Sequence, residues 1–209
     1  VDDFEFSQAY GMFYDKLEKA NAFLGNIIAT AHLPFDDRAV TLLLENPAPD
    51  GGEWRFAANL IEKWGVVPKE VMPETACTKD SSQMNRYLNR LLRRDAAILR
   101  AAVEQGKSDE ELQERRRQMM EDVHRVLCIC LGEPPASFEW EWRDDNGEFH
   151  RDGVLTPREF YQRYVDVDLT QYVCLVDDPR AEHPKGHTLT VDHMGNVVGG
   201  RPILYVNTP

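Results

Sequence analysis

Two long helical segments joined by one short break constrain the fold of this chain more than any other feature. Residues 80–105 carry apolar side chains at three- and four-residue steps, and residues 108–131 carry a second such stripe. Gly106 ends the first segment, while Ser108 and Glu111 have the spacing of a capping box that restarts the helix. We therefore expect a helical hairpin in the middle of the chain.

Three more helices are expected on the N-terminal side of this hairpin. Apolar residues recur at helical spacing over residues 4–32, and the hydroxyl of Ser7 can cap that helix. Shorter patterns predict helices over residues 36–45 and 53–64, separated by a turn rich in proline and glycine at residues 46–52. The first half of the chain is thus predicted to be helical.

Strand patterns occur only in the last third of the chain. The run Ser137–Trp142 alternates apolar and polar residues, and Asn146-Gly147 follows it as a hairpin turn signal. Thr156 and Pro157 open a short helix over residues 158–164. This order predicts an α+β fold, mostly helical, with a few short antiparallel strands toward the C-terminal end. The remaining strand-like runs are Gln171–Val176, His187–Val191 and Ile203–Val206.

The charge of the chain argues against nucleic acid as a partner. Its 209 residues carry a formal net charge of −12, which disfavours non-specific contact with phosphate backbones. Residues 78–125 hold 11 basic and 9 acidic residues, so this segment carries +2 and the remainder −14. We interpret its basic stripe as a solvated face or a contact between subunits. The stripe comprises Arg86, Arg90, Arg93, Arg94, Arg100 and Arg115–Arg117. No apolar run approaches the ~20 residues that a membrane-spanning helix needs.

The four cysteines match neither a disulfide framework nor a C-x-x-C pair. Cys77 lies in a predicted linker, Cys128 and Cys130 in an apolar helical run, and Cys174 in a strand-like run. Buried apolar thiols are generally inert, so none of the four is expected to act as a nucleophile. Reduced thiols of this kind favour a cytoplasmic protein.

A group of histidines near the C-terminal end is a candidate metal site. His183, His187, Asp192 and His193 are close in sequence, but they form no i, i+4 pair on a helix and no H-E-x-x-H motif. Zinc normally needs three or four convergent ligands, whereas a strand would separate these side chains. We interpret them as ordinary surface histidines and expect neither a metal nor a cofactor.

Four blocks of sequence resemble one family of peptidases. Together, and in this order, they are similar to the aminopeptidase C and bleomycin hydrolase family of papain-like cysteine peptidases. The resemblance covers most of the chain and is least specific over residues 82–150. The blocks are Phe4–Gln8 with Asp15–Asn21, Asp50–Trp54 with Asn59–Lys69, Thr156–Tyr161, and Gly195–Pro202.

This resemblance implies a partial papain-like fold and a division of the chain into three parts. Residues 1–77 would be the helical part of the core, residues 78–135 a helical-hairpin insertion, and residues 136–209 short strands and loops returning to the core. In the family the catalytic cysteine lies upstream of the first block, and the catalytic histidine and asparagine lie downstream of the last. The chain, which begins at Val1 without an initiator methionine, is therefore expected to be an internal portion with no catalytic residue and no peptidase activity alone.

The resemblance also points to one substrate-binding segment, Asp50, Gly51, Gly52, Glu53 and Trp54. It is similar to the glycine-pair loop that lines the non-prime side of papain-like clefts. Glycines let a peptide backbone approach closely, and a free N–H and C=O can pair with it like an added strand. Glu53 and Trp54 would then flank a pocket for a substrate side chain. Read from spacing alone, the same residues would only form a tight turn before a helix.

Two functions from different classes follow from the sequence. The first is part of a cysteine aminopeptidase that removes N-terminal residues from peptides and assembles as a homo-oligomer, hexameric in some members of the family. The second is a stand-alone helical interaction or oligomerisation domain. The sequence of the gene on either side of these 209 residues would discriminate between them.

Overall fold

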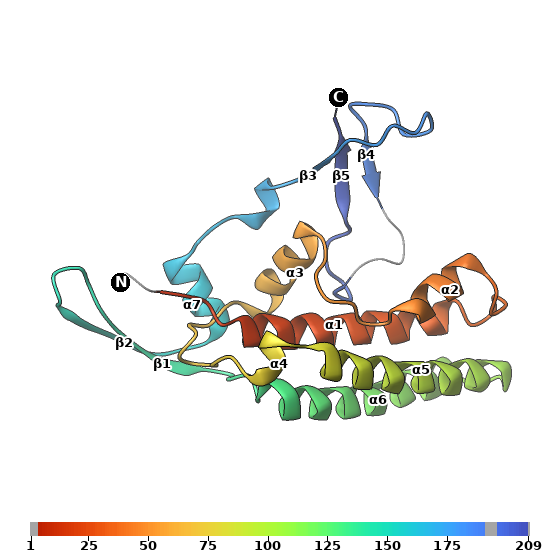
Figure 1. Cartoon of the computed structure of the whole chain (residues 1–209), viewed down its shortest axis with the longest axis horizontal. Coiled ribbons are helices and arrows are strands. Elements are labelled where there is room, and N and C mark those ends of the chain that lie inside the picture. Colours follow the sequence, from red (N-terminus) through yellow and green to blue (C-terminus); the bar gives the residue numbers. More distant parts are fainter. Residues whose placement is uncertain (1–3, 191–195, 209) are drawn as a thin grey trace.

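The computed structural model describes residues 4–190 and 196–208. Over these residues the chain is mostly helical, with short strands late in the sequence, so the α+β prediction is confirmed (Figure 1). The helices are α1 (Gln8–Ala29), α2 (Arg38–Glu45), α3 (Trp54–Trp64), α4 (Ala76–Lys79), α5 (Ser82–Glu104), α6 (Asp109–Leu131) and α7 (Pro157–Tyr164), with a 3-10 turn at Leu169–Gln171. The strands are β1 (Phe138–Arg143), β2 (Phe149–Leu155), β3 (Cys174–Val176), β4 (Thr188–Thr190) and β5 (Leu204–Asn207).

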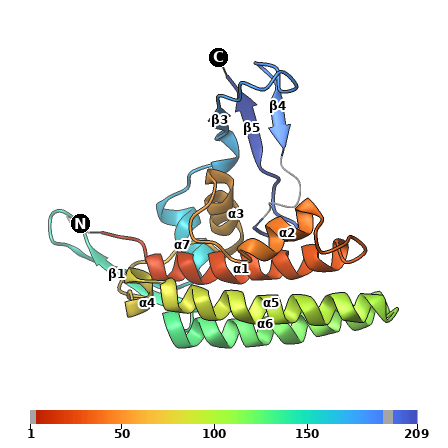
Figure 2. The same cartoon turned by 45° about the vertical axis from the view of Figure 1, so that its right-hand side comes forward.

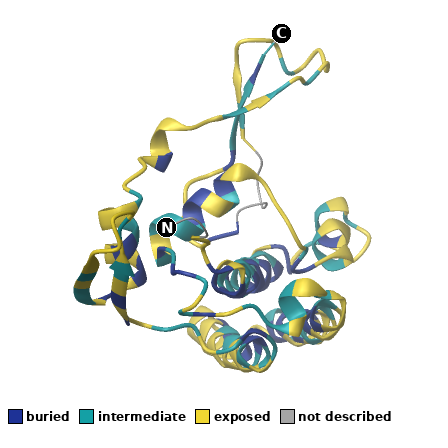
Figure 3. Cartoon of the chain, turned by 60° about the vertical axis from the view of Figure 1, so that its left-hand side comes forward, coloured by how far each residue is buried: buried dark blue, intermediate teal, exposed yellow. Residues whose placement is uncertain are grey.

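Helix α1 lies at the centre of the molecule. The hairpin of α5 and α6 runs along one side of it, and α2 and α3 lie on the other (Figures 1 and 2). Phe13 and Leu24 of α1, Leu92 of α5 and Leu127 of α6 are fully buried in one hydrophobic core. The outer faces of α5 and α6 are exposed, as their amphipathic sequences require (Figure 3). No helix in the described part of the chain has the length and apolar character of a membrane span.

The predicted helix boundaries are correct within a few residues, and local capping explains the differences. Ser7 Oγ accepts a hydrogen bond from Tyr10 N at 3.0 Å, so α1 begins at Gln8 rather than at residue 4. Glu5 is extended instead, and its carbonyl accepts from Lys69 N at 2.9 Å. At the hairpin, the capping box of Ser108 and Glu111 is confirmed.

Two small sheets complete the fold of the described residues. Strands β1 and β2 form the predicted antiparallel hairpin around Asn146-Gly147, with a register shift after Trp140. In the second sheet β4 pairs antiparallel with β5, whereas β3 pairs parallel with β5, which differs from the antiparallel expectation. The predicted strand over Gln171–Val176 is shorter: Gln171 belongs to the 3-10 turn that Asp168 caps by accepting from Thr170 N, and pairing with β5 begins only at Cys174. Val191, the predicted end of β4, lies outside the described residues.

The basic stripe on α5 is only partly a solvated face. Arg100 is buried, donates to Thr30 O at 3.1 Å and Leu33 O at 2.5 Å, and stacks on Phe35 at 4.4 Å. Arg93 donates to two carbonyls at the end of α2, Leu44 O and Glu45 O. The two guanidinium groups therefore hold the end of α2 and the segment between α1 and α2 against the hairpin.

Candidate functional site

The predicted binding segment forms the loop between α2 and α3. Asp50 to Glu53 precede the helix, and Trp54 is its first residue. All five residues from Asp50 to Trp54 are exposed, while Arg55, the next residue, is buried. The exposed loop is thus followed directly by a helix that has buried residues in the core.

Two buried lysines of α1 hold this loop in place. Lys16 Nζ donates to Ala48 O at 2.8 Å and forms an ion pair with Asp50 Oδ1 at 2.6 Å. Lys19 Nζ donates to Pro49 O at 2.9 Å and to Gly51 O at 2.6 Å, and also pairs with Asp15. Because both ammonium groups are almost completely buried, they need these partners to offset the cost of leaving water.

The carboxylate of Asp50 links the loop to the hairpin as well as to α1. Its Oδ2 accepts from Ser81 Oγ at 2.7 Å and from Asn85 Nδ2 at 2.6 Å. Desolvation opposes the charged form, but the hydrogen bonds from Lys16, Ser81 and Asn85 hold the pKa of Asp50 below its usual range. At neutral pH the ionised carboxylate of Asp50 therefore holds the loop to α1 and to the start of α5.

The two glycines serve different purposes in the loop. Gly51 has φ +68°, a left-handed conformation that a side chain would strain, although there is open space around it. A Cβ on Gly52 would lie 2.5 Å from Cδ2 of Phe56, so the ring of α3 occupies that space. The carbonyl of Gly51 is already bonded to Lys19, whereas Gly52 forms no hydrogen bond with another described residue. Gly52 is thus the residue whose N–H and C=O remain available to a peptide.

A pocket of about 580 Å³ opens beside this loop, between α1 and α3. Its volume falls in the range of small-molecule and peptide side-chain sites. The loop forms one wall, and mostly apolar side chains form the others. The lining includes Asp50, Gly51, Gly52 and Glu53 of the loop, Tyr10, Tyr14 and Asp15 of α1, and Phe56, Leu60 and Trp64 of α3.

A third buried charge on α1 fixes the far end of the pocket. Glu18 Oε1 accepts from Lys63 Nζ at 2.6 Å and from Trp64 Nε1 at 3.0 Å. The Trp64 ring stacks on Tyr14 with centroids 4.0 Å apart, and Trp64 O accepts from the hydroxyl of Tyr10. Burial raises the pKa of this Tyr10 hydroxyl above its ordinary value, so the phenol stays neutral. Helix α1 therefore sets both ends of α3.

The structure gathers four of the five predicted binding residues at the pocket and leaves one outside it. Trp54 is not part of the lining and lies against Tyr172, with ring centroids 5.7 Å apart. Glu53 faces Tyr205 of β5. Burial of Tyr205, together with that neighbouring carboxylate, raises its pKa to about 12.

Sequence reasoning missed the three buried charges of α1, which are Lys16, Glu18 and Lys19. Their signal was present as charged residues lying within a helix whose other buried positions are apolar. They also fall inside the block Asp15–Asn21, one of the blocks that resemble the peptidase family.

The four cysteines do not provide the setting of an activated nucleophile. Cys77 lies in the short helix α4 rather than in an irregular linker, and Cys174 is half-buried in β3. Cys128 Sγ is 3.5 Å from Nδ1 of His124, one turn earlier on α6. However, it lies in the last turns of that helix, where the helix dipole disfavours a thiolate, and burial raises its pKa.

The C-terminal histidines are only partly described. Arg180 pairs with the carboxylate of Asp178, and His183 Nδ1 lies 2.6 Å from Asp178 Oδ2, so the pKa of Asp178 is held well below its usual range. Neither His183 nor His187 belongs to a group of three potential metal ligands among the described residues. Asp192 and His193 lie outside those residues.

Fold and sequence define the class of this protein. The sequence model of the Peptidase C1-like family matches residues 1–209, and the chain belongs to this family. The resemblance inferred from the four sequence blocks is thereby confirmed.

Named relatives agree with this family. Aminopeptidase C of Listeria innocua is 48% identical over 99% of this chain, and bleomycin hydrolase of Homo sapiens is 42% identical over 100% of it. The crystal structure of PepW from Lactobacillus rhamnosis superimposes with a TM-score of 0.96 at 43% identity over 99% of the chain. The 209 residues span 46% of the Listeria protein, 47% of the human protein and 46% of the PepW chain, which is about half of each.

Proposed function

We propose that these 209 residues are an internal portion of a cysteine aminopeptidase that removes N-terminal residues from peptides. The relatives named aminopeptidase C and bleomycin hydrolase support this class of activity. The observation that carries the proposal is the Gly52 backbone, which is exposed, free of partners among the described residues, and placed at the mouth of the pocket. A peptide strand can pair with the N–H and C=O of Gly52 while one of its side chains enters the pocket.

The chain contributes substrate binding in this proposal and not the covalent chemistry. A papain-like nucleophile is a thiolate at a helix N-terminus, activated by a histidine that is itself oriented by an amide. Cys128 has a histidine nearby, but it lies at the wrong end of its helix and its raised pKa favours the thiol. The catalytic cysteine, histidine and asparagine would come from the parts of the relatives that this chain does not span.

The first experiment compares the 209-residue chain with the polypeptide encoded by the whole gene. The purified 209-residue chain should release no coumarin from an aminoacyl-coumarin substrate, whereas the whole gene product should release it. In the whole product, Gly52→Ala should raise KM more than it lowers kcat, because the substitution disturbs backbone pairing and not the nucleophile. Hydrolysis by the isolated chain, inhibited by a thiol reagent and absent in Cys128→Ser, would contradict the proposal.

We also propose that the protein self-associates through the helical hairpin, residues 78–135, acting as an insertion into the core. Tyr87 and Ile98 of α5 and Ile129 of α6 are large apolar residues on exposed positions of that hairpin. Light scattering should give a mass above the 24.0 kDa of one chain, rising with concentration, and Ile129→Glu should lower it. A strict monomer at every concentration would contradict this role.

Four free thiols also fit a cytoplasmic location.

A further inference from the structure

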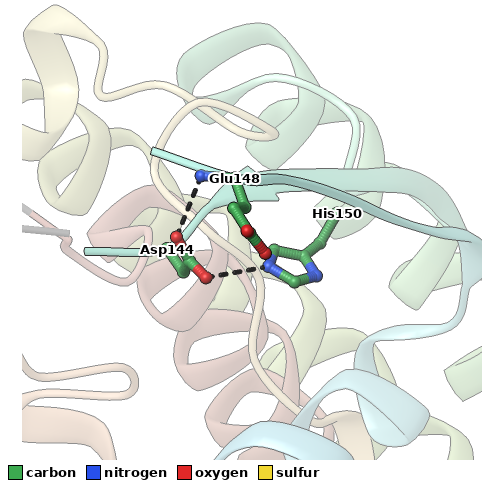
Figure 4. A group of neighbouring side chains, drawn as sticks. All are labelled: Asp144, Glu148 and His150. Carbon is green, nitrogen blue, oxygen red and sulfur yellow. Dashed lines mark hydrogen bonds and ion pairs between the residues drawn. The ribbon is translucent and has the colours of Figure 1, made fainter. Parts of the chain in front are cut away.

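A cluster of three potential metal ligands lies on the β1–β2 hairpin, outside the pocket beside the glycine loop. Asp144 follows β1, Glu148 precedes β2, and His150 is the second residue of β2. One ligand atom from each side chain lies within 4.8 Å of the other two. Figure 4 shows both carboxylates approaching the same imidazole ring.

The hairpin geometry explains why these three residues meet. Side chains at i and i+2 of a strand point to the same face, which places Glu148 and His150 together. Across the hairpin, Trp142 pairs with His150, and Asp144 N donates to Glu148 O at 3.1 Å. The Asn146-Gly147 turn therefore brings Asp144 opposite Glu148 on that same face.

The two carboxylates differ in the hydrogen bonds that they already accept. Asp144 Oδ1 accepts from Asn146 N and Glu148 N, both at 2.9 Å, which fixes this carboxylate and leaves Oδ2 3.3 Å from His150 Nε2. Despite some desolvation, these bonds keep the pKa of Asp144 below its usual range. The carboxylate of Glu148 forms no hydrogen bond or ion pair with another described residue. The cluster thus contains one carboxylate, that of Glu148, that pairs with no cationic side chain among the described residues.

The imidazole is held in place independently of the carboxylates. The ring of Trp142 stacks on His150 with centroids 4.2 Å apart and planes 17° from parallel. This contact restricts the rotation of the imidazole and keeps Nε2 directed toward Asp144. An oriented ring of this kind loses little further freedom when it binds a ligand.

We propose that Asp144, Glu148 and His150 bind a divalent transition metal of the zinc type, with water completing the coordination. Two ligand atoms that each lie ~2.1 Å from a zinc ion at tetrahedral angles are ~3.4 Å apart. The distance from Asp144 Oδ2 to His150 Nε2 is 3.3 Å, which already matches. A nitrogen with two carboxylate oxygens suits zinc, nickel or cobalt, while calcium selects oxygen ligands alone.

The test is a calorimetric titration of Zn²⁺ into the untagged, chelator-treated 209-residue chain. One saturable site per chain is expected. His150→Gln and Glu148→Gln should each weaken binding by about tenfold or more. Glu148→Gln is the stricter variant, because its carboxylate bonds no described residue and the hairpin should stay folded. His183→Gln is the matched control, since this histidine also faces one aspartate yet belongs to no three-ligand group among the described residues.

Tryptophan fluorescence locates the ion by a second route. Cu²⁺ quenches nearby indole rings, so it should quench the wild-type chain, and Trp142→Phe should remove most of that quenching. The proposal is overturned if no saturable Zn²⁺ binding occurs, or if His150→Gln binds as tightly as the wild type. It is also overturned if His183→Gln abolishes binding, which would move the ion to the segment between β3 and β4.

Discussion

Lys19→Met on α1 should strongly destabilise the fold. It removes the donor to Pro49 O and Gly51 O and leaves the Asp15 carboxylate without its ion pair. Removing one partner of a buried pair costs about 3–5 kcal/mol of unfolding free energy. Urea denaturation followed by circular dichroism measures this loss. Hydrogen exchange should also become faster across residues 48–53, because the loop loses its fastening.

The matched control is Lys69→Met. Lys69 also contacts two carboxylates, Glu5 and Glu74, but its side chain is largely exposed. Ion pairs of exposed side chains contribute little to stability, so this variant should unfold close to the wild type. Equal losses for the two lysines, or an unchanged exchange rate in the loop of Lys19→Met, would contradict the role assigned to Lys19.

Gly65→Ala should be the most damaging substitution among the glycines that the structure describes. Gly65 ends α3 with φ +74°, and a Cβ there would lie 2.3 Å from the backbone C and O of Pro157. The left-handed conformation and the overlap with the backbone of α7 each cost on the order of 1–3 kcal/mol, so about 3 kcal/mol or more should be lost. Thermal and urea unfolding of the purified variant measure this difference.

Gly11→Ala is the control for this prediction. Gly11 lies within α1, has a helical φ, and has open space where the Cβ would be. Alanine is the better helix former, so this variant should gain about 0.5–1 kcal/mol. If Gly65→Ala unfolded within error of the wild type, the close approach of α3 to α7 would be wrong.

The sequence predicted features that depend on residues close together in the chain. The capping box of Ser108 and Glu111, the cap at Ser7 and the Asn146-Gly147 turn each work over a few residues, so their signals are local. The order of helices and strands followed from the same kind of pattern. Boundaries moved by a few residues where a cap or a 3-10 turn replaced the first turn of an element.

Features that depend on distant partners could not be read in this way. Lys16 and Lys19 count as solvent-facing in any helical pattern, yet they bind backbone carbonyls about thirty residues further along. Arg100 reads as part of a solvated stripe, yet it closes the end of α1. Every residue has a backbone carbonyl, so the residue types along the chain do not indicate which carbonyl a buried lysine or arginine binds.

The dependence of the glycine loop on α1 has a consequence for protein engineering. The conformation of the loop depends on contacts with Lys16 and Lys19 rather than on its own residues, so the loop cannot be transplanted by itself. A graft of residues 48–54 onto another scaffold would carry the recognition surface without the two cations that hold it. The smallest unit that can be transplanted is the helix and the loop together.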